Sequence, residues 1–256
     1  MMIFDSHAHY DDEAFLEDRE QLLGSLEKNG IGKVVNVGAS METSRASIDL
    51  AKKYDYIYAS VGVHPSEVEE LTLEKINELK EYSGFDKVVA IGEIGLDYYY
   101  PTPDRKLQKE WFYKQLDLAV ETNLPVIIHS REAAADTMNI LKEYKDKITK
   151  GVIHCYSYGV QMAKEFTDMG YYIGIGGVLT FNNAKKLKEV AKEIPIEKIV
   201  LETDCPYLSP VPNRGKRNSS LNLEYVVKEL AQIKDLSEEE VIEITYKNTM
   251  NLYGID

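Results

Sequence analysis

The sequence predicts an α/β fold, a (β/α)8 TIM barrel that forms one domain over residues 1–256, with extra helices after the last strand. Short apolar runs, eight in all, recur about every 20 to 35 residues. Their near-continuous Val and Ile content is typical of parallel strands buried on both faces. Stretches with helical spacing separate these runs, and 256 residues matches the about 250 residues that such a barrel needs.

The eight predicted strands are apolar runs that end at or near a Gly, His or Pro residue. They are "MIFDSHAH" (2–9), "KVVNVGAS" (33–40), "IYASVGVHP" (57–65), "KVVAIGEIGLD" (87–97), "PVIIHSRE" (125–132), "GVIHCYS" (151–157), "YYIGIGGVL" (171–179) and "IVLETDCP" (199–206). No GxGxxG motif follows the first run, and the glycines of "IGIGGV" lie inside a late strand, which weakens a dinucleotide-binding alternative.

Helical spacing is clear between several of these strands and again after the last one. The ranges are 17–30, which closes on Gly30, then 44–54, 105–125 and 132–145, and finally 222–235 and 237–254. The last helix opens with a capping box formed by Ser237 and Glu240. Trp111 and Phe112 fall at core spacing in their helix, so we expect them to pack.

Composition limits where and with what the protein acts. No apolar run approaches the length of a membrane span, and the N-terminus lacks a signal-peptide pattern, so we expect a cytoplasmic protein with no membrane contact. The two cysteines, Cys155 and Cys205, cannot form a disulfide framework. A net charge of −13 disfavours broad wrapping of nucleic acid but leaves a local basic pocket open. We assume a monomer.

The unusual polar residues fall at the ends of the predicted strands. The carboxyl ends of barrel strands face the active site. Six of the eight strands end in His or a carboxylate residue, namely His7 and His9, His64, Glu93, His129, His154 and Asp204, which include all five histidines of the chain. A shared site explains this distribution better than chance.

These residue types suit a metal centre. Because side chains two apart on a strand share a face, His7 and His9 reach one ion, whereas Cys155 and Cys205 point away and are excluded as ligands. Nitrogen and carboxylate ligands suit divalent cations such as Zn²⁺, Mn²⁺ or Mg²⁺. The six ligands His7, His9, Glu93, His129, His154 and Asp204 are too many for one open zinc site, so we expect two ions bridged by Glu93.

Each of these residues has a structural alternative. A lone His-x-His pair is more often a hydrogen-bonded strand terminus. Asp204 suits a turn cap, and His64, which precedes Pro65, is either a substrate contact or a turn residue. Glu202 shares the face of Asp204, and we expect it to orient an imidazole such as His154. Asp11 and Asp12 fit an ordinary solvated loop.

The motifs together resemble a known family. "DSHAH", "GVHP", "GEIGLDYY", "PVIIHSRE", "GVIHCYS" and "LETDCPYL" occur in the order found in the TatD family of metal-dependent hydrolases, similar to the amidohydrolase superfamily. The resemblance runs from Asp5 to about Asn218. It implies a two-metal phosphodiesterase, typically a deoxyribonuclease, with the six residues above as ligands and Glu93 where other superfamily members carry a carbamylated lysine. This chain has Ser219 and Ser220 where the family has Glu-Pro.

Two of the carboxylates have predicted catalytic roles, and residues that follow the strand ends have predicted substrate-binding roles. Asp204 is the expected proton acceptor from a bridging water, and Glu93 the second catalytic carboxylate. Arginines 105, 131, 214 and 217 follow strand ends, so we expect them to ring one mouth and attract an anionic substrate. The predicted substrate contacts are His64, Tyr98, Arg131, Arg214, Lys216, Arg217 and Asn218. The tyrosines of residues 98–100 either stack a base or pack the loop.

We therefore predict a divalent-metal-dependent hydrolase, a deoxyribonuclease that trims single-stranded ends. The first alternative keeps the metals and hydrolyses an ester or amide, including the aminoacyl ester of a transfer RNA. The second is a non-metal barrel enzyme that binds phosphate through Arg131 and Arg214. The third is an interaction protein without catalysis, which the complete ligand set disfavours.

Overall fold

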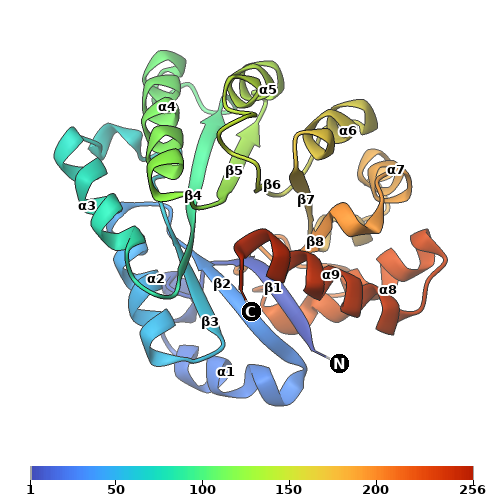
Figure 1. Ribbon diagram of the computed structural model, residues 1–256. Helices are drawn as coiled ribbons and strands as arrows, with labels where there is room; N and C mark the ends of the chain where they lie inside the picture. Colours follow the sequence, from blue (N-terminus) through green and yellow to red (C-terminus); the bar gives the residue numbers. More distant parts are fainter. Residues whose placement is uncertain (1, 256) are drawn as a thin grey trace.

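Eight parallel strands pair in sequence order, β1 to β8, around a common axis (Figure 1). The computed structural model describes residues 2–255. The strands are β1 Ile3–Ala8, β2 Ile31–Val37, β3 Ile57–Val61, β4 Val88–Asp97, β5 Val126–Arg131, β6 Gly151–Ile153, β7 Tyr171–Ile175 and β8 Ile199–Leu201. A parallel bridge between Ala8 and Cys205 links the first strand to the segment after the last. The predicted (β/α)8 TIM barrel and its eight strands are confirmed.

Helices alternate with the strands and surround them (Figure 1). They are α1 Arg19–Leu26, α2 Met41–Lys53, α3 Leu73–Ser83, α4 Arg105–Thr122, α5 Ala134–Glu143, α6 Val160–Asp168, α7 Lys185–Glu193, α8 Leu223–Lys234 and α9 Glu238–Tyr253. The capping box at Ser237 and Glu240 is present, with Ser237 Oγ accepting from the Glu240 amide. Phe112 is fully buried in the core. None of the helices described over residues 2–255 is long and apolar enough to cross a membrane.

The barrel interior at the amino-terminal ends of the strands is filled by side chains. Phe4, Val35, Val89, Ile127, Val152 and Val200 form one cluster with Leu252 and Tyr253 of α9. Most of their apolar strand neighbours belong to a second cluster, which includes buried residues of the helices. Because successive strand residues alternate between faces, the first cluster lies inside the barrel and closes this end. The opposite, carboxyl end is left for polar residues.

Candidate metal centre

The six predicted ligands meet at the carboxyl end of the barrel. His7 Nε2 lies 3.0 Å from His9 Nε2 and 3.5 Å from Glu93 Oε2. His9 Nε2 lies 3.4 Å from Asp204 Oδ1, and His129 Nδ1 lies 2.8 Å from Glu93 Oε1. His154 Nε2 is 3.8 Å from Glu93 Oε1 and 3.7 Å from Asp204 Oδ1. Residues up to 197 positions apart in the chain thus form one cluster around the Glu93 carboxylate.

Local irregularities in two strands aim these side chains. The pairing of β1 with β2 shifts register between Asp5 and Ala8, where His7 lies. The pairing of β4 with β5 shifts between Ile91 and Ile94, and the Glu93 amide instead donates to the Gly38 carbonyl at 2.7 Å. Such irregularities re-aim side chains beside active sites. Glu93 therefore lies in the middle of β4, not at its end as the sequence suggested, and still reaches the centre.

Backbone and carboxylate partners fix the orientation of two imidazoles. His9 Nδ1 donates to the Val37 carbonyl at 2.9 Å, so in the neutral ring Nε2 holds the lone pair and faces Asp204. His154 Nδ1 lies 3.2 Å from Glu202 Oε2, which leaves Nε2 facing Glu93 and Asp204. An imidazole held in this way at one nitrogen presents the other to a metal. Glu202 thus contacts His154 as expected.

His64 has the opposite arrangement. The Ser66 amide donates to His64 Nδ1 at 3.1 Å, so Nδ1 holds the lone pair and the neutral ring carries its proton on Nε2. That Nε2 lies 3.8 Å from Glu93 Oε1 and lines the mouth of the barrel. Burial, followed by the neighbouring His129, lowers the pKa of His64 to about 4. The ring is neutral near pH 7 and offers an N–H donor to the mouth.

The charge of the centre fits divalent cations. Within residues 2–255, the carboxylates of Glu93, Glu202 and Asp204 have ion-pair contacts with imidazoles alone and none with lysine or arginine. Burial raises the pKa of Glu93, but His154 and the other imidazoles hold it well below its ordinary value. His7 is 1% exposed and its Nδ1 has no hydrogen-bond partner. Buried carboxylates and imidazoles of this kind are stable when they bind metal.

Four groups, three of which share residues, bring potential ligand atoms within 4.8 Å of one another. They are His7–His9–Asp204, His64–Glu93–His129, His7–His154–Glu202 and His154–Cys155–Asp204. The last group corrects the exclusion of Cys155. That exclusion assumed strand alternation, but β6 ends at Ile153 and Cys155 has a φ of 44°, so its thiol lies near the centre.

Sequence reasoning missed two carboxylates that support the centre. Asp97, the last residue of β4, places Oδ2 3.1 Å from His129 Nε2. Asp5 accepts from Thr203 Oγ1 at 2.7 Å and from Ser220 Oγ at 2.6 Å, which ties β1 to the segment before Asp204. Burial raises the pKa of Asp5 to about 7 against these hydrogen bonds. Both residues belong to motifs that contain predicted ligands. Asp97 lies in "GEIGLD" with Glu93, and Asp5 lies in "FDSHAH" with His7 and His9.

A cavity of about 700 Å³ opens above the centre, and we call it the mouth. Its residues include His9, His64, Glu93, Asp97, His129, Arg131, His154 and Asp204. The rim adds Asp11, Asp12, Glu13, Glu42 and Glu67, and the tyrosines Tyr100 and Tyr207. Among the described lining residues, Arg131 is the one arginine or lysine, so the expected ring of four arginines is wrong.

The other arginines contact protein groups. Arg217 forms an ion pair with Asp18 at 2.6 Å and donates to the Ala14 carbonyl, and Arg214 lies 4.3 Å above the Phe181 ring. Arg105 stacks 4.3 Å over the ring of Tyr98. A long side chain at a strand end can turn outward to a carboxylate or ring, which the sequence position does not reveal.

Three further predicted contacts also lie outside the mouth lining. Tyr98 donates its hydroxyl to Asp136 at 2.6 Å. Asn218 is 1% exposed and donates to the carbonyls of Thr203 and Tyr207. Lys216 is exposed on the same loop. Asn218 therefore holds the segment around Asp204 in place, and Tyr100 takes the mouth position expected for Tyr98.

Two loops are more ordered than the sequence suggested. Asp11 accepts from Asn36 Nδ2 at 2.7 Å, and Asp12 caps the short helix Glu13–Phe15 and accepts from the Tyr207 hydroxyl. Ser220, which replaces the family's proline, is fully buried and its amide donates to the Tyr10 hydroxyl at 2.9 Å. The departure from the family pattern thus anchors the loop to Asp5 and Tyr10.

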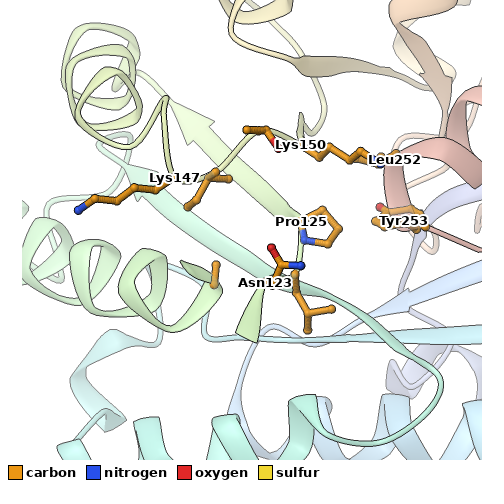
Figure 2. Close-up of a pocket in the computed structure, with 11 residues that line it drawn as sticks. Asn123, Pro125, Lys147, Lys150, Leu252 and Tyr253 are labelled. Carbon is orange, nitrogen blue, oxygen red and sulfur yellow. The ribbon is translucent and has the colours of Figure 1, made fainter. Parts of the chain in front are cut away.

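A separate cavity of about 410 Å³ lies at the amino-terminal ends of β5 and β6 (Figure 2). Asn123, Pro125, Lys147 and Lys150 line it together with Leu252 and Tyr253 of α9 (Figure 2). None of its described lining residues is a His, Asp or Glu. The described lining of this cavity therefore offers no imidazole or carboxylate to hold a metal ion.

Barrel, histidine cluster and mouth together define the class of metal-dependent barrel hydrolases. The model of the family "TatD related DNase" matches residues 4–254. The metal-dependent hydrolase YabD of Bacillus subtilis is 41% identical over the full length of both chains. YcfH of Escherichia coli K12, also described as a metal-dependent hydrolase, is 35% identical over 100% of this chain and 97% of its own.

Solved structures agree with these relatives. The crystal structure of YJJV, a TatD homolog from Escherichia coli K12, has a TM-score of 0.93 and 30% identity, and covers 99% of this chain and 98% of its own. A TatD family hydrolase from Entamoeba histolytica has a TM-score of 0.87 and 27% identity, covering 99% and 98%. This chain belongs to the TatD family of metal-dependent hydrolases.

Proposed function

We propose that this protein is a divalent-cation-dependent phosphodiesterase that trims the ends of single-stranded DNA. The convergence of His7, His9, Glu93, His129, His154 and Asp204 at the base of the mouth carries the proposal. Membership of a family described as TatD related DNase supports the choice of bond. Because Cys155 and Cys205 are both free thiols, we also propose that the protein acts in the cytoplasm.

Two cations fit the cluster. His7, His9 and Asp204 would hold one ion. Glu93 and His129 would hold the other, with His154, whose Nε2 is 3.8 Å from Glu93 Oε1, as a further ligand. When bound, two such cations lower the pKa of a shared water and stabilise the attacking and leaving oxygens of a phosphodiester. The chain's own contribution is the orientation of His9 by the Val37 carbonyl and of His154 by Glu202.

Residues at the mouth supply the proton acceptor and the phosphate contacts. Asp204 turns Oδ1 toward His9 and His154, which leaves Oδ2 to accept the proton of the attacking water. The His64 Nε2–H points into the mouth, where it would donate to a phosphate oxygen. Arg131, which also lines the mouth and stacks 3.8 Å over the ring of Tyr99, would bind a second phosphate oxygen.

The rim of the mouth favours a strand end over a long nucleic acid. Tyr100 and Tyr207 are more than half exposed there, 54% and 56%, and offer ring faces on which bases stack. The rim carboxylates repel additional phosphates, because Arg131 is the one cation among the described lining residues. A short single-stranded terminus places one phosphate at the centre with few others nearby.

The same rim gives some support to the ester or amide alternative. A rim rich in carboxylates suits a substrate with little negative charge, and an activated water attacks a carbonyl carbon as readily as phosphorus. Aminoacyl-ester hydrolysis is therefore the second candidate.

End-labelled oligonucleotides test the proposal directly. We expect the protein supplied with Mn²⁺ or Zn²⁺ to release mononucleotides, and His129→Ala and Asp204→Ala to lower the rate on the order of a thousandfold. Glu224→Ala, an exposed carboxylate on α8, is the control and retains the rate. No cleavage of any DNA or RNA, together with turnover of carboxylic esters, would overturn the nuclease assignment in favour of the second candidate.

A further inference from the structure

A second, smaller cavity adjoins the mouth, and the loops after β6, β7 and β8 enclose it. We call it the side chamber, of about 270 Å³, with walls from Cys155, Gly174, Gly177, Val178, Leu187 and Leu208. Glu202 and Asp204 lie at its floor, and the exposed residues Ser157, Asn183 and Lys186 form its outer rim. This volume is far above the about 30 Å³ of one water and near the lower end of ligand pockets.

Asp204 connects the two cavities. It lines both the mouth and the side chamber, and its Oδ1 lies within 3.7 Å of His9 and His154 nitrogens. A substrate whose scissile bond lies at the metal centre can therefore extend a neighbouring group past Asp204 into the side chamber.

Glycines of β7 and its following loop let Glu202 and the segment of Leu208 pack closely against them, which sets the position of these two walls of the side chamber. A Cβ on Gly174 would lie 2.3 Å from Glu202 Oε2, and a Cβ on Gly176 would lie 2.9 Å from the Glu202 carbonyl oxygen. A Cβ on Gly177 would lie 2.1 Å from the Leu208 carbonyl oxygen. The glycine-rich run "IGIGGV" thus has a spatial reason, because β7 supplies space where the other strands supply ligands.

The chemistry of the side chamber excludes a phosphate. Its floor carries the carboxylates of Glu202 and Asp204, where Glu202 accepts from the Cys155 amide through Oε1 and faces His154 Nδ1 at 3.2 Å through Oε2. Val178 and Leu187 make the walls apolar, and Lys186, the one cation among the described lining residues, is exposed at the rim. An uncharged planar ring with N–H donors matches apolar walls over a carboxylate floor.

We propose that the side chamber binds the nucleobase of the terminal nucleotide while its phosphodiester lies at the metal centre. This proposal rests on the proposed nuclease function, because that function supplies the nucleotide. It makes the base, as well as the phosphate, a determinant of which ends are processed.

Binding of a free nucleoside tests the side chamber without turnover. We expect deoxyadenosine to bind the Mn²⁺-supplied protein in calorimetric titration. Deoxyribose 5-phosphate has no base, so its affinity should be the same for the wild-type protein and for variants of the side chamber. Val178→Phe and Ala184→Leu fill the side chamber from two walls and should weaken deoxyadenosine at least about fivefold. Val120→Phe, the same change on the exposed surface of α4, is the matched control.

Cleavage supplies the second measurement. The wild-type protein should prefer a normal 3′ or 5′ end over the same end with an abasic terminal residue by at least about fivefold, and Val178→Phe should bring that ratio close to one. Deoxyadenosine binding that is absent, or equal in all variants, overturns the side-chamber proposal. Failure to cleave any oligonucleotide overturns the nuclease function, while the titration still decides whether the side chamber takes a base.

Discussion

In His9 and His64, the hydrogen bond at Nδ1 decides what Nε2 can do. The Val37 carbonyl accepts from His9 Nδ1 and so leaves a lone pair on Nε2 for a cation. The Ser66 amide donates to His64 Nδ1 and so leaves a proton on Nε2 for an anionic oxygen. Five histidines at strand ends were visible in the sequence, but this division of roles depends on backbone groups that only the fold brings to them.

The His64→Ala substitution tests this division. We expect the variant to keep its bound metal and to lose on the order of a hundredfold in kcat/KM, because a phosphate contact is removed. His129→Ala should instead lose metal, since that ring contacts Glu93 at 2.8 Å. Elemental analysis of both proteins, beside steady-state kinetics, separates the two roles. Loss of an ion from His64→Ala would make His64 a ligand.

Strand β4 is the element on which the centre depends most. Glu93 and Asp97 both belong to it, and Gly95 between them has a φ of 145° and approaches β5 closely. A Cβ at Gly95 would lie 2.0 Å from the carbonyl oxygen of His129. Close approach of β4 to β5 therefore sets the distance from Glu93 to His129, and glycine is required for it.

We expect Gly95→Ala to lower the free energy of unfolding by at least about 2 kcal/mol, because the new methyl group forces the two strands apart. Metal content should fall as well. Gly24→Ala on α1 is the matched control, since a Cβ there meets nothing within 4 Å, and it should stabilise by about 0.5–1 kcal/mol. Chemical denaturation measures both. A Gly95→Ala protein as stable as wild type would show that β4 and β5 can separate freely.

The sequence predicts the strands and the residues at their ends better than it predicts the loops. Strand ends are predictable because apolar runs mark the strands and the carboxyl ends of parallel strands lie at one end of the barrel. The sequence therefore predicted that His7 and Asp204 share one site. Loops obey no such rule. Arg217 follows a strand end yet pairs with Asp18, and Cys155 turns toward the centre through a positive φ. Asp97 ends the predicted fourth strand, but its contact with His129 depends on the register of β4 against β5, which the sequence does not indicate.

At the scale of the whole molecule, charge limits the length of nucleic acid that can bind. The chain has a net charge of −13, and the mouth adds rim carboxylates around Arg131. Affinity for single strands falls with salt in proportion to the phosphates neutralised. A mouth with so few cations neutralises one or two phosphates, unlike a groove that follows a long strand.

We therefore expect a weak dependence of oligonucleotide binding on salt. Raising the salt from about 50 to about 200 mM should weaken binding to a metal-supplied Asp204→Ala protein only about two- to sevenfold, as one or two contacts require. A longer oligonucleotide should bind with nearly the same affinity and the same salt dependence. Fluorescence anisotropy at several salt concentrations measures the slope. A loss of about a thousandfold would mean six or more phosphate contacts and a basic surface elsewhere.

Metal binding and the stability of the barrel are coupled, because the centre joins strands from both ends of the sequence. His7 on β1, Glu93 on β4 and Asp204 after β8 meet at the point where the barrel closes, beside the bridge between Ala8 and Cys205. An unfolded chain cannot present them together, so an ion binds the native state in preference. At about 100 times its dissociation constant, one ion stabilises by about 2.7 kcal/mol, which corresponds to a Tm increase of roughly 5–10 °C for a chain of this size. Thermal unfolding should give a Tm that is higher by this amount with Mn²⁺ or Zn²⁺ than with EDTA. The His129→Ala protein should show a smaller difference. An equal Tm in EDTA and in metal would mean that these residues hold no cation.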